Sequence, residues 1–158
     1  NESPIMEMSI SESSESTMGW SFDAKIDISI IGDSLISLVA TNESFAGGAH
    51  GSYETYFINV DPNTGKHIVL SDLLKPGYEG VLLKAGEEAF RNTLELPDSV
   101  TYSDEGYEFP NDVFQLNSNY GFTNEGIRFV FNAYEVAPYV LGAQDFVIPY
   151  DRIKDWIK

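Results

Sequence analysis

The chain has 158 residues and a mass of 17.6 kDa, and its 42% hydrophobic and 13% aromatic residues are enough for the core of one ordinary domain. Nine Lys and Arg against 25 Asp and Glu give a formal net charge of −16, which excludes nucleic acid as a partner because a polyphosphate would be repelled. The absence of cysteine excludes disulfides and thiolate metal sites, and no apolar run approaches the roughly 20 residues that span a bilayer.

Residues 1–18 are rich in Ser and Glu, which is typical of a solvated linker. Met6, Met8 and Ile10 alternate with polar residues, however, and this is the periodicity of a strand. The segment is therefore expected to be a linker, the last strand of an upstream domain or an edge strand of this one, with residues 19–158 as the main domain. Because the chain starts at Asn1 without a signal-type segment, a targeting segment is expected upstream.

Alternating apolar and polar residues predict four strands in the first half of the chain. The first is a half-buried strand in which Phe22, Ala24, Ile26, Ile28 and Ile30 share one face. The others are expected over residues 34–41, 52–60 and 66–70, with a tight turn at 61–65.

The second half is predicted to contain one long helix and further strands. Pro76 to Leu94 has the spacing of an amphipathic helix, in which Glu87 and Arg91 form an i,i+4 pair. An exposed acidic loop is expected over 98–112, strands over 113–116, 120–123, 127–132 and 146–150, and a short C-terminal helix through Trp156. The predicted fold class is α+β, with an antiparallel sheet of about six strands packed against the long helix.

The sequence offers no recognisable catalytic or cofactor motif. Neither His50 nor His67 lies in a metal-ligand spacing, and the usual nucleophile, phosphate-loop and dinucleotide motifs are absent. The prediction is therefore a protein that is not an enzyme and has no catalytic residues, metal or cofactor. A hydrolase that uses two surface carboxylates remains an alternative, because sequence spacing does not show which carboxylates meet.

Two loops of low charge have features that a plain structural scaffold does not need. One is residues 45–51, where the double glycine permits close backbone approach, and the other is residues 133–142, which are aromatic and contain a proline. The predicted binding residues in these loops are Gly47, Gly48, His50, Tyr134, Glu135, Pro138 and Tyr139. The alternatives are that Tyr134 and Tyr139 fold back over the end of the sheet, and that His50 is a structural residue bonded to loop backbone.

Three segments in this order, Gly47-Gly48-Ala49-His50, Tyr134-Glu135-Val136-Ala137-Pro138-Tyr139 and Pro149-Tyr150, carry a family resemblance. The region from Trp20 to Trp156 resembles the C-terminal domain of the anti-sigma factor RsiV, a domain of unknown function that also accompanies the peptidoglycan deacetylase PdaC. The resemblance implies an extracytoplasmic bacterial domain preceded by a second small domain and a membrane anchor. It also implies recognition of a basic protein such as lysozyme.

Composition and resemblance together predict a non-enzymatic binding domain of the cell envelope, either periplasmic, surface-anchored or secreted. Its expected partner is a basic protein, toward which a net charge of −16 would steer it. The alternative is a peptidoglycan- or carbohydrate-binding module that uses exposed Tyr and Trp rings as stacking platforms.

Overall fold

The computed structural model describes residues 8–10 and 19–158. The predicted linker positions 1–7 and 11–18, including Met6, lie outside the described residues. Within the predicted linker, the described strand β1 (Met8–Ile10) pairs antiparallel with β2 (Ser21–Ile31), so that it forms an edge strand of the domain's first sheet. The division of the chain at residue 19 stays a prediction.

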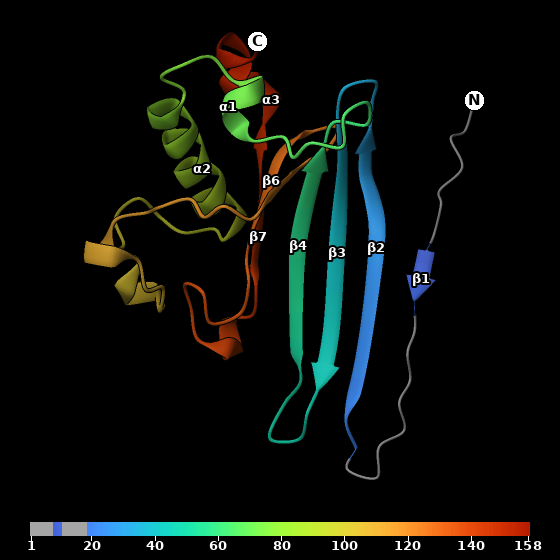
Figure 1. Ribbon diagram of the computed structural model, residues 1–158. Coiled ribbons are helices and arrows are strands. Elements are labelled where there is room, and N and C mark those ends of the chain that lie inside the picture. Colours follow the sequence, from blue (N-terminus) through green and yellow to red (C-terminus); the bar gives the residue numbers. More distant parts are fainter. Residues whose placement is uncertain (1–7, 11–18) are drawn as a thin grey trace.

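The described chain forms two antiparallel sheets, as Figure 1 shows. The first has the order β1-β2-β3-β4, with β3 at Ile36–Phe45 and β4 at Ser52–Val60. The second has the order β5-β6-β7, with strands at Tyr120–Phe122, Gly126–Phe131 and Gln144–Pro149. The antiparallel α+β class is confirmed, whereas the expectation of one six-stranded sheet is wrong.

The sheets are separate because the chain leaves the first sheet after β4. A turn closed by the Gly65 N–H and the Asp61 carbonyl (2.8 Å) is followed by a single bridge between Val60 and His67. The chain then enters the short helix α1 (Leu70–Leu73), where the Asp72 carboxylate accepts the Val69 N–H at 3.0 Å. The strand predicted over 66–70 is therefore wrong, and so is the strand over 113–116.

The main helix α2 covers the second sheet alone. It runs over Glu79–Thr93, within the predicted Pro76 to Leu94, and packs against β7 with Leu82, Ala85, Gly86 and Phe90 buried. After Pro149 ends β7, α3 (Tyr150–Ile153) and the 3₁₀ turn η4 (Lys154–Trp156) form the expected short C-terminal helix. The predicted Glu87–Arg91 pair is present at 3.8 Å.

The predicted acidic loop is only partly exposed. It contains the 3₁₀ turns η1 (Ser103–Glu105) and η2 (Pro110–Asp112), and its carboxylates lie at or near the surface. Tyr102, Tyr107 and Phe109, by contrast, are buried, and their rings lie against that of Phe90 on α2. The expectation of an exposed loop rested on the acidic residues of this segment and did not consider its aromatic residues, so it is wrong for these three side chains.

Buried polar groups join the two sheets. The Ser37 hydroxyl on β3 donates to Asn59 Oδ1 (2.6 Å) and accepts the Phe122 N–H of β5 (2.9 Å). Asn59 Nδ2 donates to the Tyr120 carbonyl at 2.9 Å. Since each of these donors is matched to an acceptor, the contact keeps its polar groups satisfied while it excludes water.

Only one face of the first sheet meets the second sheet. The face that carries Ser37, Phe57 and Asn59 contacts β5, whereas Phe22, Ile26 and Ile28 on the other face are exposed. The expectation that β2 buries its apolar alternating residues is therefore wrong for Phe22, Ile26 and Ile28. Ile30 does pack against the core, because a register shift between Ile28 and Ile30 places it opposite Ser37.

Candidate functional site

The first half of the site is the hairpin between β3 and β4. Gly47 and Gly48 have φ angles of 87° and 108°, in the left-handed region where a side chain is strained, and nothing lies within 4 Å of where their Cβ atoms would be. The two glycines thus shape the turn without making contacts. The turn places His50 at the end of the hairpin, next to the first residues of β4.

The second half is the loop that joins β6 to β7, over residues 132–143. Two hydrogen bonds close it, from the Tyr134 N–H to the Ala137 carbonyl (3.1 Å) and from the Glu135 N–H to the Asn132 carbonyl (3.0 Å). Val136 and Ala137 are buried in the core, while the 3₁₀ turn η3 (Tyr139–Leu141) lies outside it. The loop therefore has a packed base and a displayed tip.

His50, Tyr134 and Tyr139 meet where these two loops touch, and we call them the aromatic cluster. The rings of His50 and Tyr139 are stacked, with centroids 3.7 Å apart and planes 15° apart. Tyr134 lies 5.6 Å from Tyr139 between centroids, and its hydroxyl is 3.2 Å from His50 Nε2. The structure thus brings together three predicted site residues that are up to 89 positions apart in the chain.

The hydrogen bonds of the cluster define the tautomer of His50. Nδ1 lies 3.0 Å from the Gly51 carbonyl, which can only accept, so Nδ1 must carry the proton. In the neutral ring Nε2 is then free to accept the Tyr134 hydroxyl proton. The same Gly51 carbonyl accepts the Tyr139 hydroxyl at 2.9 Å. His50 is therefore bonded to loop backbone, as the structural alternative expected, and also orients both tyrosines.

The tip of the second loop is an exposed apolar surface. Tyr134 is 65% exposed and Val140 is 87% exposed, and Leu141 beside them is also exposed. Tyr134 has a φ of 70°, a left-handed conformation that costs a side-chain-bearing residue about 1 kcal/mol. The tyrosines lie against the hairpin end, as the covering alternative expected, and Tyr134 also presents ring surface to solvent, while their role in binding stays a prediction.

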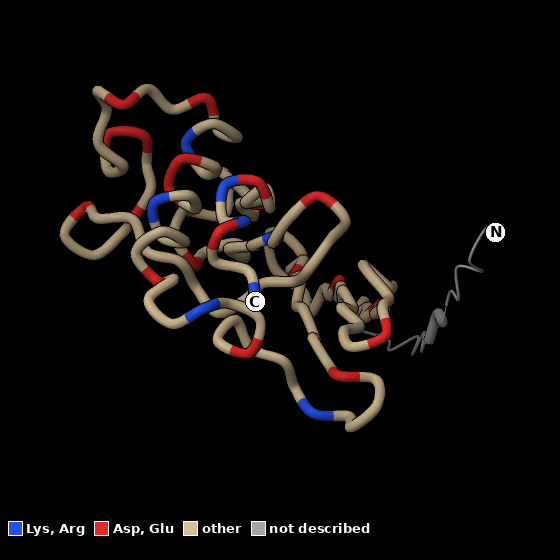
Figure 2. The backbone as a smooth tube through the Cα atoms, turned by 90° about the horizontal axis from the view of Figure 1, so that it is seen from above, with Lys and Arg blue, Asp and Glu red and all other residues tan. Residues whose placement is uncertain are grey.

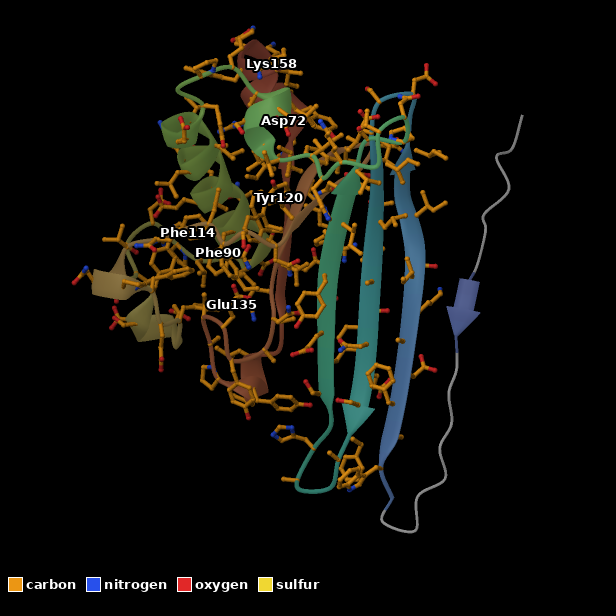
Figure 3. The ribbon with its side chains drawn as sticks, viewed as in Figure 1. Asp72, Phe90, Phe114, Tyr120, Glu135 and Lys158 are labelled. Carbon is orange, nitrogen blue, oxygen red and sulfur yellow. The ribbon has the colours of Figure 1, made fainter. Side chains whose placement is uncertain are left out.

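Glu135 and Pro138 have different surroundings from the aromatic cluster. Both carboxylate oxygens of Glu135 accept hydrogen bonds inside the protein, from Asn117 Nδ2 (2.7 Å) and the Asn132 N–H (2.9 Å). Glu135 thus braces the base of the loop (Figure 3). Pro138 is exposed and precedes η3, where its fixed φ holds the turn.

The sequence analysis missed three participants of the site. The role of the Gly51 carbonyl left no signal in the sequence, because a pattern of residue types does not show which backbone carbonyl accepts a side-chain hydrogen bond. Val140 and Leu141 did have one, since an adjacent apolar pair in a loop of low charge indicates that the pair is either packed on the core or displayed at the surface.

The described residues contain neither a metal-ligand cluster nor a membrane-spanning helix. Across residues 8–10 and 19–158, no group of three or more His, Asp or Glu side chains is arranged to hold a metal ion. In the same part of the chain, no helix has the length and apolar character needed to cross a membrane.

Two solved structures resemble the chain. A DUF3298 family protein from Pseudomonas aeruginosa PAO1 is 27% identical, with a TM-score of 0.69 over 89% of this chain and 63% of its own. A DUF3298 family member from Bacteroides fragilis shares the fold at 21% identity, with a TM-score of 0.74 over 91% of this chain and 57% of its own. This chain therefore spans about three fifths of the length of each of these relatives.

No curated protein matches the chain. The model of the family described as "Protein of unknown function (DUF3298)" matches residues 71–151, just over half of the chain. The matched region extends from α1 to α3 and includes the loop between β6 and β7. The chain belongs to the DUF3298 family.

Proposed function

We propose that this chain is a non-enzymatic binding domain of an extracytoplasmic envelope protein, and that the aromatic cluster with Val140 and Leu141 is its recognition surface. The ligand in this proposal is a basic protein, of which lysozyme is the example that the RsiV resemblance suggests. An upstream anchor belongs to the same proposal.

The observation that carries the proposal is that large exposed rings are held still before any ligand arrives. The His50–Tyr139 stack and the hydroxyl bonds to His50 and Gly51 fix the side chains of both tyrosines. Fixed aromatic groups lose little entropy on binding, and tyrosine is enriched among the residues that dominate interface energies. A cluster that served only to cover the hairpin would not need Tyr134 and Val140 so exposed.

The charge of the chain supports a basic partner. Asp and Glu are spread over the described backbone and outnumber Lys and Arg (Figure 2). Such a field attracts a cationic protein from beyond contact distance and raises the association rate, an effect that salt weakens.

A glycan-binding module is the second candidate, and the exposed ring of Tyr134 favours it. Tyr139 is less suited to stack on a sugar, because His50 already occupies one of its faces at 3.7 Å. One free ring is a smaller platform than the several that a carbohydrate site usually combines. The basic protein therefore remains the first proposal.

The test is a calorimetric titration of the chain with hen egg-white lysozyme and, separately, with peptidoglycan fragments, while release of reducing sugars is monitored. We expect saturable binding of lysozyme that weakens as salt rises. Binding of the fragments alone would favour the module, and sugar release without lysozyme would reveal a hydrolase.

A variant set then locates the surface. Tyr139→Ala is expected to weaken binding by about 2 kcal/mol, as for an interface anchor, with a smaller change in the free energy of unfolding. Val113→Ala, which also removes an exposed apolar side chain but lies before β5, is the matched control and should bind normally. Unchanged binding by a folded Pro138→Ala/Tyr139→Ala double variant would show that this loop is not the site.

A further inference from the structure

The first sheet presents an apolar face away from the second sheet. In the register of β2, β3 and β4, Ile28 lies opposite Leu38 and Leu38 opposite Ile58, and the next row is Ile26, Ala40 and Tyr56. Directly opposed residues of antiparallel strands point to the same side of a sheet. We call this side the outer face, and its apolar residues are Phe22, Ala24, Ile26, Ile28, Leu38, Ala40, Tyr56 and Ile58.

The outer face is open among the described residues. Phe22, Ile28 and Tyr56 are 54%, 42% and 46% exposed, and no residue of the face belongs to the core cluster of the described chain. Alternate residues on the same strands, such as Ser37 and Asn59, are instead bonded to the second sheet. Two adjacent rows of apolar side chains in water are unfavourable, since burying side chains of this size removes apolar surface from water.

The distribution of charge indicates what would cover this face. The other side of the same sheet carries Asp23, Asp27 and Glu43, and the surface of α2 carries Glu79, Glu87 and Glu88. The outer face has one carboxylate, Glu54 on the edge strand β4, whose Oε2 accepts a hydrogen bond from Asn42 Nδ2 at 3.2 Å. Two copies of a chain with a net charge of −16 repel each other across the acidic surfaces but not across this one. A basic partner, by contrast, would be drawn to the acidic surfaces.

The shape of the face also suits a second copy. Ala24 and Ala40 lie among larger residues, so that Ile26 or Tyr56 of a facing sheet can enter the shallow positions above them. We propose that two copies of this chain associate face to face through their outer faces, as a two-fold symmetric dimer. The contact would place both aromatic clusters in one assembly.

The size of the outer face determines how strongly the two copies are expected to associate. Three strands about 4.8 Å apart and four residue rows cover on the order of a few hundred Å², below the about 800 Å² per partner of a stable complex. The dimer should therefore be weak and depend on concentration. It should also strengthen with salt, because salt screens the repulsion between the copies and leaves the apolar contact intact.

The experiment is analytical ultracentrifugation of the 158-residue chain from about 10 μM to about 1 mM, at about 0.05 M and about 0.5 M NaCl. The weight-average mass is expected to rise from 17.6 kDa toward twice that value, and to rise at lower protein concentration in the higher salt. A mass that stays at the monomer value up to the highest concentration in both salts would overturn the proposal.

Charge-matched variants test the location. Ile28→Asp, and separately Ile26→Asp, should weaken self-association at least about tenfold, because each places an unpaired carboxylate in the contact. Ser21→Asp adds the same charge on the opposite side of β2, at an exposed position, and should leave association unchanged. Circular dichroism melts confirm that each variant is folded. Equal weakening by Ser21→Asp, or none by either Ile variant, would mean that the outer face is not the contact.

Discussion

Phe90 is the residue around which the core of the second sheet is built. Its fully buried ring lies 5.3–6.0 Å from six other aromatic rings, those of Tyr102, Tyr107, Phe109, Phe114, Phe131 and Phe146. Most of these pairs meet edge to face, the arrangement that aligns the positive edge of one ring with the negative face of another. One side chain on α2 thus links the loop 98–112 to strands β6 and β7.

Phe90→Ala is predicted to be the most destabilising single truncation in the core. Removing a ring with so many neighbours loses its transfer free energy and leaves a cavity, at a cost of about 3–5 kcal/mol in the free energy of unfolding. Urea denaturation of the purified variant measures this cost. Leu83→Ala, on the exposed side of the same helix, should cost less than about 1 kcal/mol. A loss below about 1.5 kcal/mol for Phe90→Ala would contradict the picture of a shared aromatic core.

At the residue scale, the sequence predicted which residues come together better than it predicted their hydrogen-bond partners. Low charge and aromatic content were sufficient to select Tyr134, Tyr139 and His50, and the structure places all three together. It was not predictable that Glu135 would use both carboxylate oxygens on Asn117 and Asn132, because hydrogen-bond partners depend on side-chain directions in the folded state.

Among the elements, β4 is distinctive because side chains take the place of a neighbouring strand. On the edge away from β3, the Thr55 N–H donates to Asn132 Oδ1 (2.8 Å), and the Thr55 carbonyl accepts Asn119 Nδ2 (2.8 Å). Asn119 Oδ1 also accepts the Phe57 N–H at 3.3 Å. An open edge is a template for aggregation, and the amides of two asparagines block this one while they tie it to the second sheet.

Asn119→Ala should therefore loosen the joint between the sheets. The substitution leaves the Phe57 N–H without its acceptor and the Thr55 carbonyl with one donor fewer, a loss of about 1–3 kcal/mol in unfolding free energy. Hydrogen exchange by NMR gives the local readout. In the variant, the amide of Phe57 should exchange faster than the amide of Leu38, which lies within β3. Asn124→Ala, in the exposed turn before β6, is the control and should change neither quantity. Unaltered exchange at Phe57 would show that Asn119 does not hold this edge.

Element types were predictable where a periodic pattern was long. The alternation over residues 21–31 and 52–60 predicts β2 and β4, and the helical spacing predicts α2. The strand expected over 66–70 fails because the pairing there is limited to a single bridge between His67 and Val60, after which the chain enters α1. Periodicity also could not show that most of the apolar side of β2 has no core against it, since that depends on which elements pack together and not on the strand itself.

Across the whole molecule, buried tyrosines link stability to alkaline pH. Burial raises the pKa of Tyr102, Tyr107, Tyr120 and Tyr150, and for Tyr102 the hydrogen bond that its hydroxyl donates to Glu87 raises the pKa further. An unfolded tyrosine loses its proton near pH 10. Above that pH the unfolded state therefore binds fewer protons than the folded state, so the unfolding free energy falls as pH rises. Below about pH 9 the tyrosines contribute no slope.

Between pH 7 and 9, tyrosine ionisation is predicted to leave the free energy of unfolding unchanged. From about pH 10 upward, it is predicted to lower the free energy of unfolding progressively. Urea unfolding at a series of pH values measures it. Tyr102→Phe keeps the buried ring but removes the ionisable hydroxyl, so its decline should be shallower than that of the parent chain. Tyr53→Phe removes the hydroxyl of an exposed tyrosine and should follow the parent curve. If Tyr102→Phe and the parent declined in parallel, proton release by the buried rings would not be the cause of alkaline unfolding, and the loss of charge by lysine side chains, which titrate in the same pH range, would have to account for it.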